Sequence, residues 1–180
     1  MQPGLQLQKT VDRLPEILEK NAVTMMRRMI ARMKAAMEQR AQEGNVSHGA
    51  LFLKVGENDL VREFERALKE ATSPAALGSA DSAVSALSLS LEAADGAEAA
   101  DEFETSTALF TRLCANAKAV GVKGTGRYHK EVFVGALKDA FEQSRMDRQA
   151  MQELRPYARA ALNAELLGLY GKLDELATAN

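Results

Sequence analysis

Basic residues gather around a glycine-rich stretch in the second half of this 180-residue chain. Gly121, Gly124 and Gly126 form a Gly-x-x-Gly-x-Gly pattern ahead of an expected helix. Such a pattern can direct backbone N–H groups and the positive end of a helix dipole at a phosphate. The pattern lacks the Gly-Lys-Ser/Thr ending of a P-loop and follows no strand, so it predicts either an anion or nucleotide site or an inter-helix loop. The side chains that would bind the anion are Lys118, Lys123, Arg127, His129 and Lys130.

Methionine recurs at helical spacing along the first long apolar stretch of the chain. A Met-rich face is typical of surfaces that accept several partners, because methionine is flexible and polarizable. The competing interpretation is a core helix filled with methionine, since leucines precede the stripe on the same face. The stripe consists of Met25, Met26, Met29, Met33 and Met37. The basic residues on the other side, Arg27, Arg28, Arg32 and Lys34, are typical of a solvated face.

A leucine seam near the C-terminus follows steps of four, three, four and three residues. Such a seam predicts a helix that packs on another helix, either in this chain or in a second copy of it. A homo-oligomer therefore stays open, and Leu166 and Tyr170 are candidate contacts for a protein partner. The seam consists of Leu162, Leu166, Leu169, Leu173 and Leu176.

The residue types needed for catalysis or metal binding are sparse. The chain has two histidines, His48 and His129, and they form no His-Glu-x-x-His zinc site. No Gly-x-Ser-x-Gly nucleophile elbow occurs, and the single cysteine, Cys114, falls on the expected buried face of a helix, where a thiol is inert. The sequence therefore predicts no catalytic site, no metal site and no cofactor.

Composition argues against several classes of partner. The net charge of −2 gives no overall attraction to nucleic acid or to a membrane surface. Aromatic residues make up 5% of the chain and tryptophan is absent, so no stacking platform for bases is visible in the basic stretches. No window approaches the roughly 18–20 apolar residues that span a bilayer, and the N-terminus lacks the apolar core of a secretory signal. A cytoplasmic location without membrane contact is expected.

The hydrophobic periodicity predicts an all-α protein, a helical bundle of about five or six helices with a long N-terminal helix. Residues 11–43 form that long helix, with Asp12 as its N-cap, Pro15 in its first turn and Gly44 after its end. Residues 5–8 are an extended lead-in, and residues 50–53 are a short helical turn. A second helix follows, capped by Asn58 and stopped before Pro74.

The second half of the chain is predicted to add three helices. They cover residues 107–120, residues 130–144 and a last segment that Asp147 opens, with Pro156 breaking or kinking the chain before residues 158–177. Residues 121–126 form a loop. The predicted organisation is a helical hairpin over 1–73, an acidic, Ala- and Ser-rich and partly helical connection over 74–106, and a C-terminal unit over 107–180 that shares one core with the hairpin.

From residue 87 to residue 176, the chain resembles a proteobacterial family known as domain of unknown function one-six-three-one. The motifs are Ser-Leu-Ser-Leu at 88–91 before an acidic stretch, Val-Phe-Val-Gly-Ala-Leu-Lys-Asp-Ala-Phe at 132–141, and the leucine-tyrosine helix at 162–176. Family members are usually much longer, and the glycine loop stands where they carry a proline-containing segment. The resemblance implies a helical protein and supplies no catalytic residues.

These observations lead to one functional expectation and two alternatives. The expectation is a non-enzymatic bacterial protein-interaction or regulatory module that binds a protein partner through the methionine face or the leucine seam. One alternative is a sensor of an anion or nucleotide at residues 118–130. The other is a nucleic-acid-binding protein.

Overall fold

The structure, a computed structural model, describes residues 3–41, 47–76 and 103–179. Within these ranges the regular elements are helices and no strand occurs, so the predicted all-α class is confirmed. The predictions for Gly44 and for most of the acidic connection lie outside the described residues. The elements are α1 (Pro3–Asp12), α2 (Leu14–Ala41), α3 (His48–Val55), α4 (Glu57–Ala71), α7 (Glu104–Ala119), the 3-10 helix η1 (Thr125–Tyr128), α8 (Lys130–Gln143) and α9 (Arg148–Thr178).

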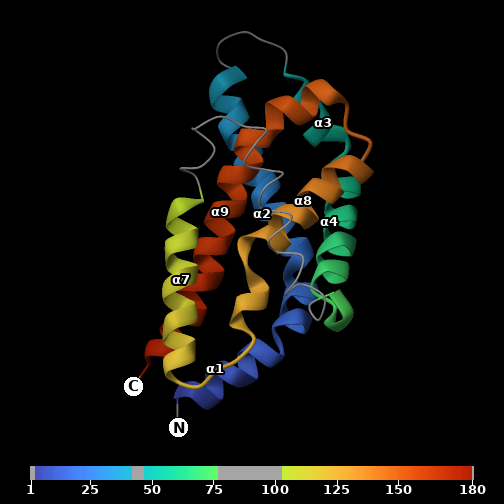
Figure 1. Cartoon of the computed structure of the whole chain (residues 1–180). Helices are drawn as coiled ribbons and strands as arrows, with labels where there is room; N and C mark the ends of the chain where they lie inside the picture. The colour runs from blue at the N-terminus through green and yellow to red at the C-terminus, as the bar shows by residue number, and fades with distance from the viewer. Residues whose placement is uncertain (1–2, 42–46, 77–102, 180) are drawn as a thin grey trace.

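The two longest helices, α2 and α9, pack against each other through the middle of the bundle (Figure 1). α4 packs on α2 and α8 packs on α4, while α7 lies along α9 on the other side. α1 contacts α9 at one end of the bundle, and α3 contacts α9 at the other. The helix with the leucine seam therefore packs on a helix of the same chain, one of the two possibilities that the sequence left open.

The chain before α2 is helical, so the predicted extended lead-in at residues 5–8 is wrong. Leu7 and Val11 lie four residues apart on one face of α1 and are buried, with 0% and 4% of their surface exposed. An α-helical backbone places both side chains in the core, which an extended segment would not do because its side chains alternate between faces. Helical structure thus begins earlier than predicted, with α1.

The boundary between α1 and α2 lies at Arg13, so the prediction of Asp12 as the N-cap of the long helix is wrong. Asp12 is the last residue of α1, and its carboxylate accepts a hydrogen bond of 2.8 Å from the Gln8 side chain. Pro15 lies in the first turn of α2, as predicted, where its missing N–H costs little.

A short helix connects the long N-terminal helix to α4. Ser47 caps α3, since its hydroxyl accepts a hydrogen bond of 3.1 Å from the Ala50 N–H. The predicted helical turn at residues 50–53 is therefore correct, within a helix of eight residues.

α4 begins at Glu57, so the predicted cap at Asn58 is wrong. Gly56 is both the C-cap of α3 and the N-cap of α4, and its N–H donates to the Phe52 carbonyl. A Cβ at this position would lie 2.7 Å from the Phe52 ring, so a larger residue here would require the Phe52 side chain to shift. α4 ends at Ala71, ahead of Pro74, as predicted.

The sequence predicted a break or a kink at Pro156, and the break does not occur, because α9 is one helix from Arg148 to Thr178 with Pro156 inside it. Pro156 cannot donate to the carbonyl of Gln152, but both residues are exposed, and water can therefore satisfy that carbonyl. The predicted cap at Asp147 is correct, because its carboxylate accepts a hydrogen bond of 2.9 Å from the Ala150 N–H. α7 begins three residues before the predicted position, at Glu104.

One hydrophobic core joins residues from both halves of the chain. Its largest fully buried side chains include Tyr170, Phe64 and Phe133, which come from α9, α4 and α8. Among the described residues, no helix combines the length and the apolar character needed to cross a membrane.

Candidate anion-binding groove

The side chains predicted to meet a protein partner lie in the chain's own core. α4 and α9 pack on the methionine face of α2, and Tyr170 of α9 donates a hydrogen bond of 2.8 Å to the Tyr128 carbonyl. Burial raises the pKa of the Tyr170 hydroxyl, which stays protonated. The prediction of an accessible partner-binding face is therefore corrected. The exposed fractions are 6% for Met25, 0% for Met29, 1% for Met33, 6% for Met37, 0% for Leu166 and 0% for Tyr170.

The basic residues of the glycine-rich stretch do not converge on one point. Lys118, Lys123 and Arg127 are exposed. His129 is half-buried with its ring against Phe110, the two centroids 5.3 Å apart. Burial lowers the pKa of His129, so the ring is held toward its neutral form. The ammonium group of Lys130 lies over an aromatic ring, that of Phe103, 5.4 Å from its centroid.

Several backbone N–H groups that could hold a phosphate in this loop already have acceptors. The Val122 N–H donates to a carbonyl of α7 at 2.8 Å, and the Lys123 N–H donates to the Gln8 side chain of α1 at 2.9 Å. Gly121 and Gly124 have φ values of 78° and 87°, so glycine is needed there for the turn itself. These contacts favour the interpretation as an inter-helix loop.

The N-terminus of α8 is also unsuited to an anion. The His129 ring nitrogen Nδ1 accepts from the Glu131 N–H at 3.5 Å and caps the helix. The Glu131 carboxylate lies in the first turn and would repel a phosphate at this end.

The cysteine and the histidines do not form a reactive cluster. Cys114 is half-buried, and desolvation raises the pKa of its thiol, although a hydrogen bond with Thr125 opposes this effect. A thiol with a raised pKa is a poor nucleophile at neutral pH. Within the described residues, no three His, Cys, Asp or Glu side chains are placed to hold a metal ion.

A groove between α2 and α9 combines a hollow with an excess of positive charge. Its volume is about 400 Å³, within the usual range for small-molecule sites. Its polar lining consists of Asn21, Arg28, Arg32, Glu165 and Lys172. Its remaining lining consists of Ile17, Leu18, Met25, Ala164, Gly168 and Leu169.

One buried carboxylate fixes two arginines at the edge of this groove. Arg28 donates from Nε to both oxygens of Glu165 at 3.1 Å and from Nη2 to Oε2 at 2.6 Å. Arg32 donates from Nη1 to Oε1 at 2.7 Å. The Glu165 side chain is 7% exposed, whereas those of Arg28 and Arg32 are 55% and 48% exposed. The hydrogen bond with Glu165 raises the pKa of Arg28.

The two guanidinium groups keep donors for a ligand. A guanidinium group has five N–H donors, and the bonds to Glu165 use only part of them. Lys172 makes no ion pair with any residue that the structure describes, and it also lines the groove. Three cations and one carboxylate therefore line the groove, which gives its lining a net charge of +2. An anion would supply the missing charge.

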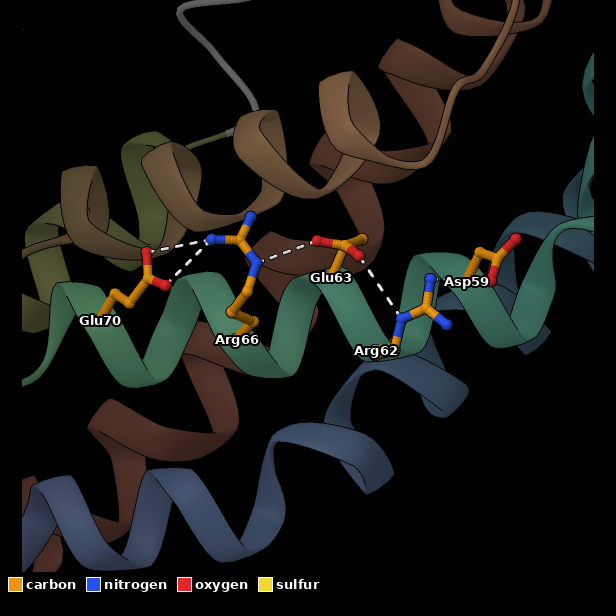
Figure 2. A network of polar contacts seen from close by, with 5 residues as sticks. All are labelled: Asp59, Arg62, Glu63, Arg66 and Glu70. Carbon is orange, nitrogen blue, oxygen red and sulfur yellow. Dashed lines mark hydrogen bonds and ion pairs between the residues drawn. The ribbon is translucent and has the colours of Figure 1, made fainter.

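A second arginine network, on α4, has more carboxylates than arginines. Figure 2 shows its side chains in a row along one helix. Arg66 lies 3.0 Å from both Glu63 and Glu70, and Arg62 lies 3.1 Å from Asp59 and 3.4 Å from Glu63. Three carboxylates thus surround two arginines, so this network has no positive charge to offer an anion.

A third polar cluster joins α7 to α9. The buried Asp174 carboxylate accepts from Arg112 Nε at 2.9 Å and from Asn116 Nδ2 at 2.8 Å. Both of its oxygens therefore have donors. This cluster fixes α7 against α9, and none of its residues lines the groove.

Two features of the sequence could have indicated the groove, although the residue types alone did not. Arg28 and Arg32 are four residues apart, and like charges at that spacing repel each other unless a counter-charge lies between them. Glu165 interrupts the leucine seam directly before Leu166, where a side chain faces another helix. Together they indicate a carboxylate that meets two arginines.

The chain was compared with protein-family models, with curated proteins and with solved structures, and none of them matches it. The resemblance to domain of unknown function one-six-three-one therefore rests on its three motifs, and the function is argued from the groove.

Proposed function

We propose that this protein is a non-enzymatic binding module that takes up an anionic group in the groove between α2 and α9. The observation that carries the proposal is the pair of half-exposed arginines fixed by the buried Glu165 beside a hollow of about 400 Å³. A guanidinium group matches the planar geometry of a carboxylate, and fixing it in advance lowers the entropy lost on binding.

Binding is favoured over catalysis by the chemistry of the lining. The groove is lined by no Ser, Thr, Cys, His or Tyr side chain that could act as a nucleophile or a general base. Its one carboxylate, that of Glu165, accepts hydrogen bonds from two arginines and is not available as a base. A regulatory role in the cytoplasm, as the sequence predicts, is part of the proposal.

The test is a titration of the purified chain with small anions at low ionic strength, monitored by the amide and arginine side-chain signals in NMR spectra. We expect carboxylates to shift the signals of Arg28 and Arg32 selectively, and Arg32→Gln to weaken binding by about fivefold to tenfold. Arg27→Gln is the matched control, because Arg27 is exposed on the same helix and does not line the groove. Equal weakening in both variants would show non-specific attraction to the helix and refute the proposal.

A further inference from the structure

The groove has two positively charged ends. One end is formed by Arg28, Arg32 and Glu165, whose charges sum to +1. The other end is formed by Lys172, which also contributes +1. Lys172 follows Glu165 by seven residues in α9, so it lies about 10 Å further along the helix at 1.5 Å per residue. The excess charge is therefore divided between two separate places.

The middle of the groove is largely apolar and open. Leu18 and Met25 of α2 and Leu169 of α9 line it, together with Asn21, whose side-chain amide donates a hydrogen bond of 2.7 Å to the Ile17 carbonyl. Gly168 lies between Glu165 and Lys172, and a Cβ added there would meet no atom within 4 Å. Glycine at this position thus leaves space in the hollow that a larger side chain would occupy.

We propose that the groove binds a linear dianion, with one carboxylate at each end and an apolar chain between them. The proposal rests on the proposed function of the groove as an anion site. A single positive charge at each end matches a carboxylate, whereas a phosphate monoester concentrates about two negative charges at one end. The apolar chain would cover Leu18, Met25 and Leu169 and occupy the space over Gly168.

The roles of the two ends differ. Fixed guanidinium groups at the Arg28–Arg32 end can bind a carboxylate through two parallel N–H donors, which also sets its orientation. The ammonium group of Lys172 is a compact charge on a flexible stem, so it can reach second carboxylates at slightly different distances. The arginine end therefore determines the orientation of the ligand, and the lysine end selects ligands with a second charge.

The experiment compares three carboxylates on the complete chain by calorimetry at low ionic strength. Sebacate has two carboxylates at the ends of a long apolar chain, decanoate has one carboxylate on a chain of the same length, and succinate has two close together. We expect sebacate to bind at least about fivefold more tightly than either of the others. Lys172→Gln should weaken the binding of sebacate more than that of decanoate and so remove the advantage of sebacate over decanoate.

Gly168→Leu tests the middle of the groove, and we expect it to abolish binding of sebacate. Gly135→Leu is the matched control, because Gly135 also lies in a helix with no atom within 4 Å of an added Cβ and does not line the groove. An unchanged helical circular dichroism spectrum and an unfolding temperature at or above that of the unsubstituted chain show that both variants fold. If Gly168→Leu folds and still binds sebacate with unchanged affinity, the inference is overturned.

The outcomes separate the inference from the proposed function. Equal affinity for decanoate and sebacate, or tighter binding of inorganic phosphate than of sebacate, would overturn the two-ended ligand while leaving an anion site at the groove. Tighter binding of an acidic peptide than of sebacate would also overturn it. If the unsubstituted chain binds none of these anions, the proposed function itself fails.

Discussion

The two faces of α2 differ in how their residue types relate to their role. One face carries the methionines Met25, Met29, Met33 and Met37, which resemble a partner-binding surface and form the core. The other carries Arg28 and Arg32, which resemble an ordinary solvated face and form the edge of the groove. Residue type alone did not show that the methionine face is buried, because the exposure of a side chain depends on what packs against it.

The difference has a simple physical basis. Apolar side chains gain free energy by leaving water, so α4 and α9 cover the methionine face. Guanidinium groups lose free energy when they leave water, so a buried acceptor such as Glu165 is needed to hold them close to a neighbouring helix. The buried acceptor therefore distinguishes this basic face from an ordinary solvated face.

The largest expected effect concerns the methionine face. Met29→Lys places an ammonium group at a position with 0% exposure, and we expect it to destabilise the fold by at least about 4 kcal/mol, enough to leave much of the chain unfolded. Met29→Leu keeps the volume and should cost less than about 1.5 kcal/mol. Urea unfolding followed by circular dichroism gives both values. A folded Met29→Lys variant with near-normal stability would show that this face is accessible.

The next effect concerns the acceptor on the other face. Glu165→Ala removes the partner of both arginines, and we expect a loss of about 2 kcal/mol, reduced from the value for fully buried pairs because the arginines are half-exposed. Glu175→Ala is the control, since Glu175 is an exposed carboxylate on the same helix. Urea unfolding measures both. A loss no larger than that of the control would mean that Glu165 does not hold α2 to α9.

A smaller effect separates the groove from the network on α4. A double-mutant cycle between Arg28 and Glu165 should give a coupling free energy of about 1 kcal/mol that persists at high salt, because the carboxylate is 7% exposed. The cycle between Arg66 and Glu70 should give a weaker coupling that salt removes, because these side chains are 45% and 64% exposed. Identical salt dependence in the two cycles would contradict the expected difference between the Glu165 ion pair and the exposed ion pairs on α4.

The smallest effect concerns His129 beside the glycine loop and the dependence of stability on pH. Burial lowers the pKa of His129 in the folded chain, so the unfolded chain binds the proton more readily. Its contribution to stability is therefore complete above the unfolded pKa of about 6.5 and declines as the pH falls below that value. His129→Asn should reduce the loss of stability between pH 7 and pH 5, measured by thermal unfolding, whereas His48→Asn should not, because His48 is exposed.

Sequence periodicity predicted much of the fold, because a helix is defined by local contacts. The helices at Glu57–Ala71 and Lys130–Gln143 and the cap at Asp147 were found within about two residues. The errors arose where a local rule competed with burial or solvation. Leu7 belongs to the buried stripe and draws residues 5–8 into a helix, and the exposed position of Pro156 lets α9 continue.

The groove was not predictable in the same way. Arg28 and Glu165 are 137 residues apart, and no local pattern states which helices will meet. The predicted site at residues 118–130 relied on closeness in sequence, yet Lys130 and His129 turn toward aromatic rings. The basic residues at 118–130 are neighbours in sequence but point in different directions. Arg28 and Glu165 are far apart in sequence but form an ion pair.

The long stretch of sequence between α2 and α9 also has a consequence for synthesis of the chain. Translation at roughly 5–20 residues per second puts on the order of ten seconds between the appearance of Arg28 and that of Glu165. During that interval the methionine face of α2 has emerged without its α9 cover. A ribosome-bound chain stopped before residue 148 therefore lacks the α9 cover, and the part of the apolar surface of α2 that α9 buries in the finished protein stays exposed.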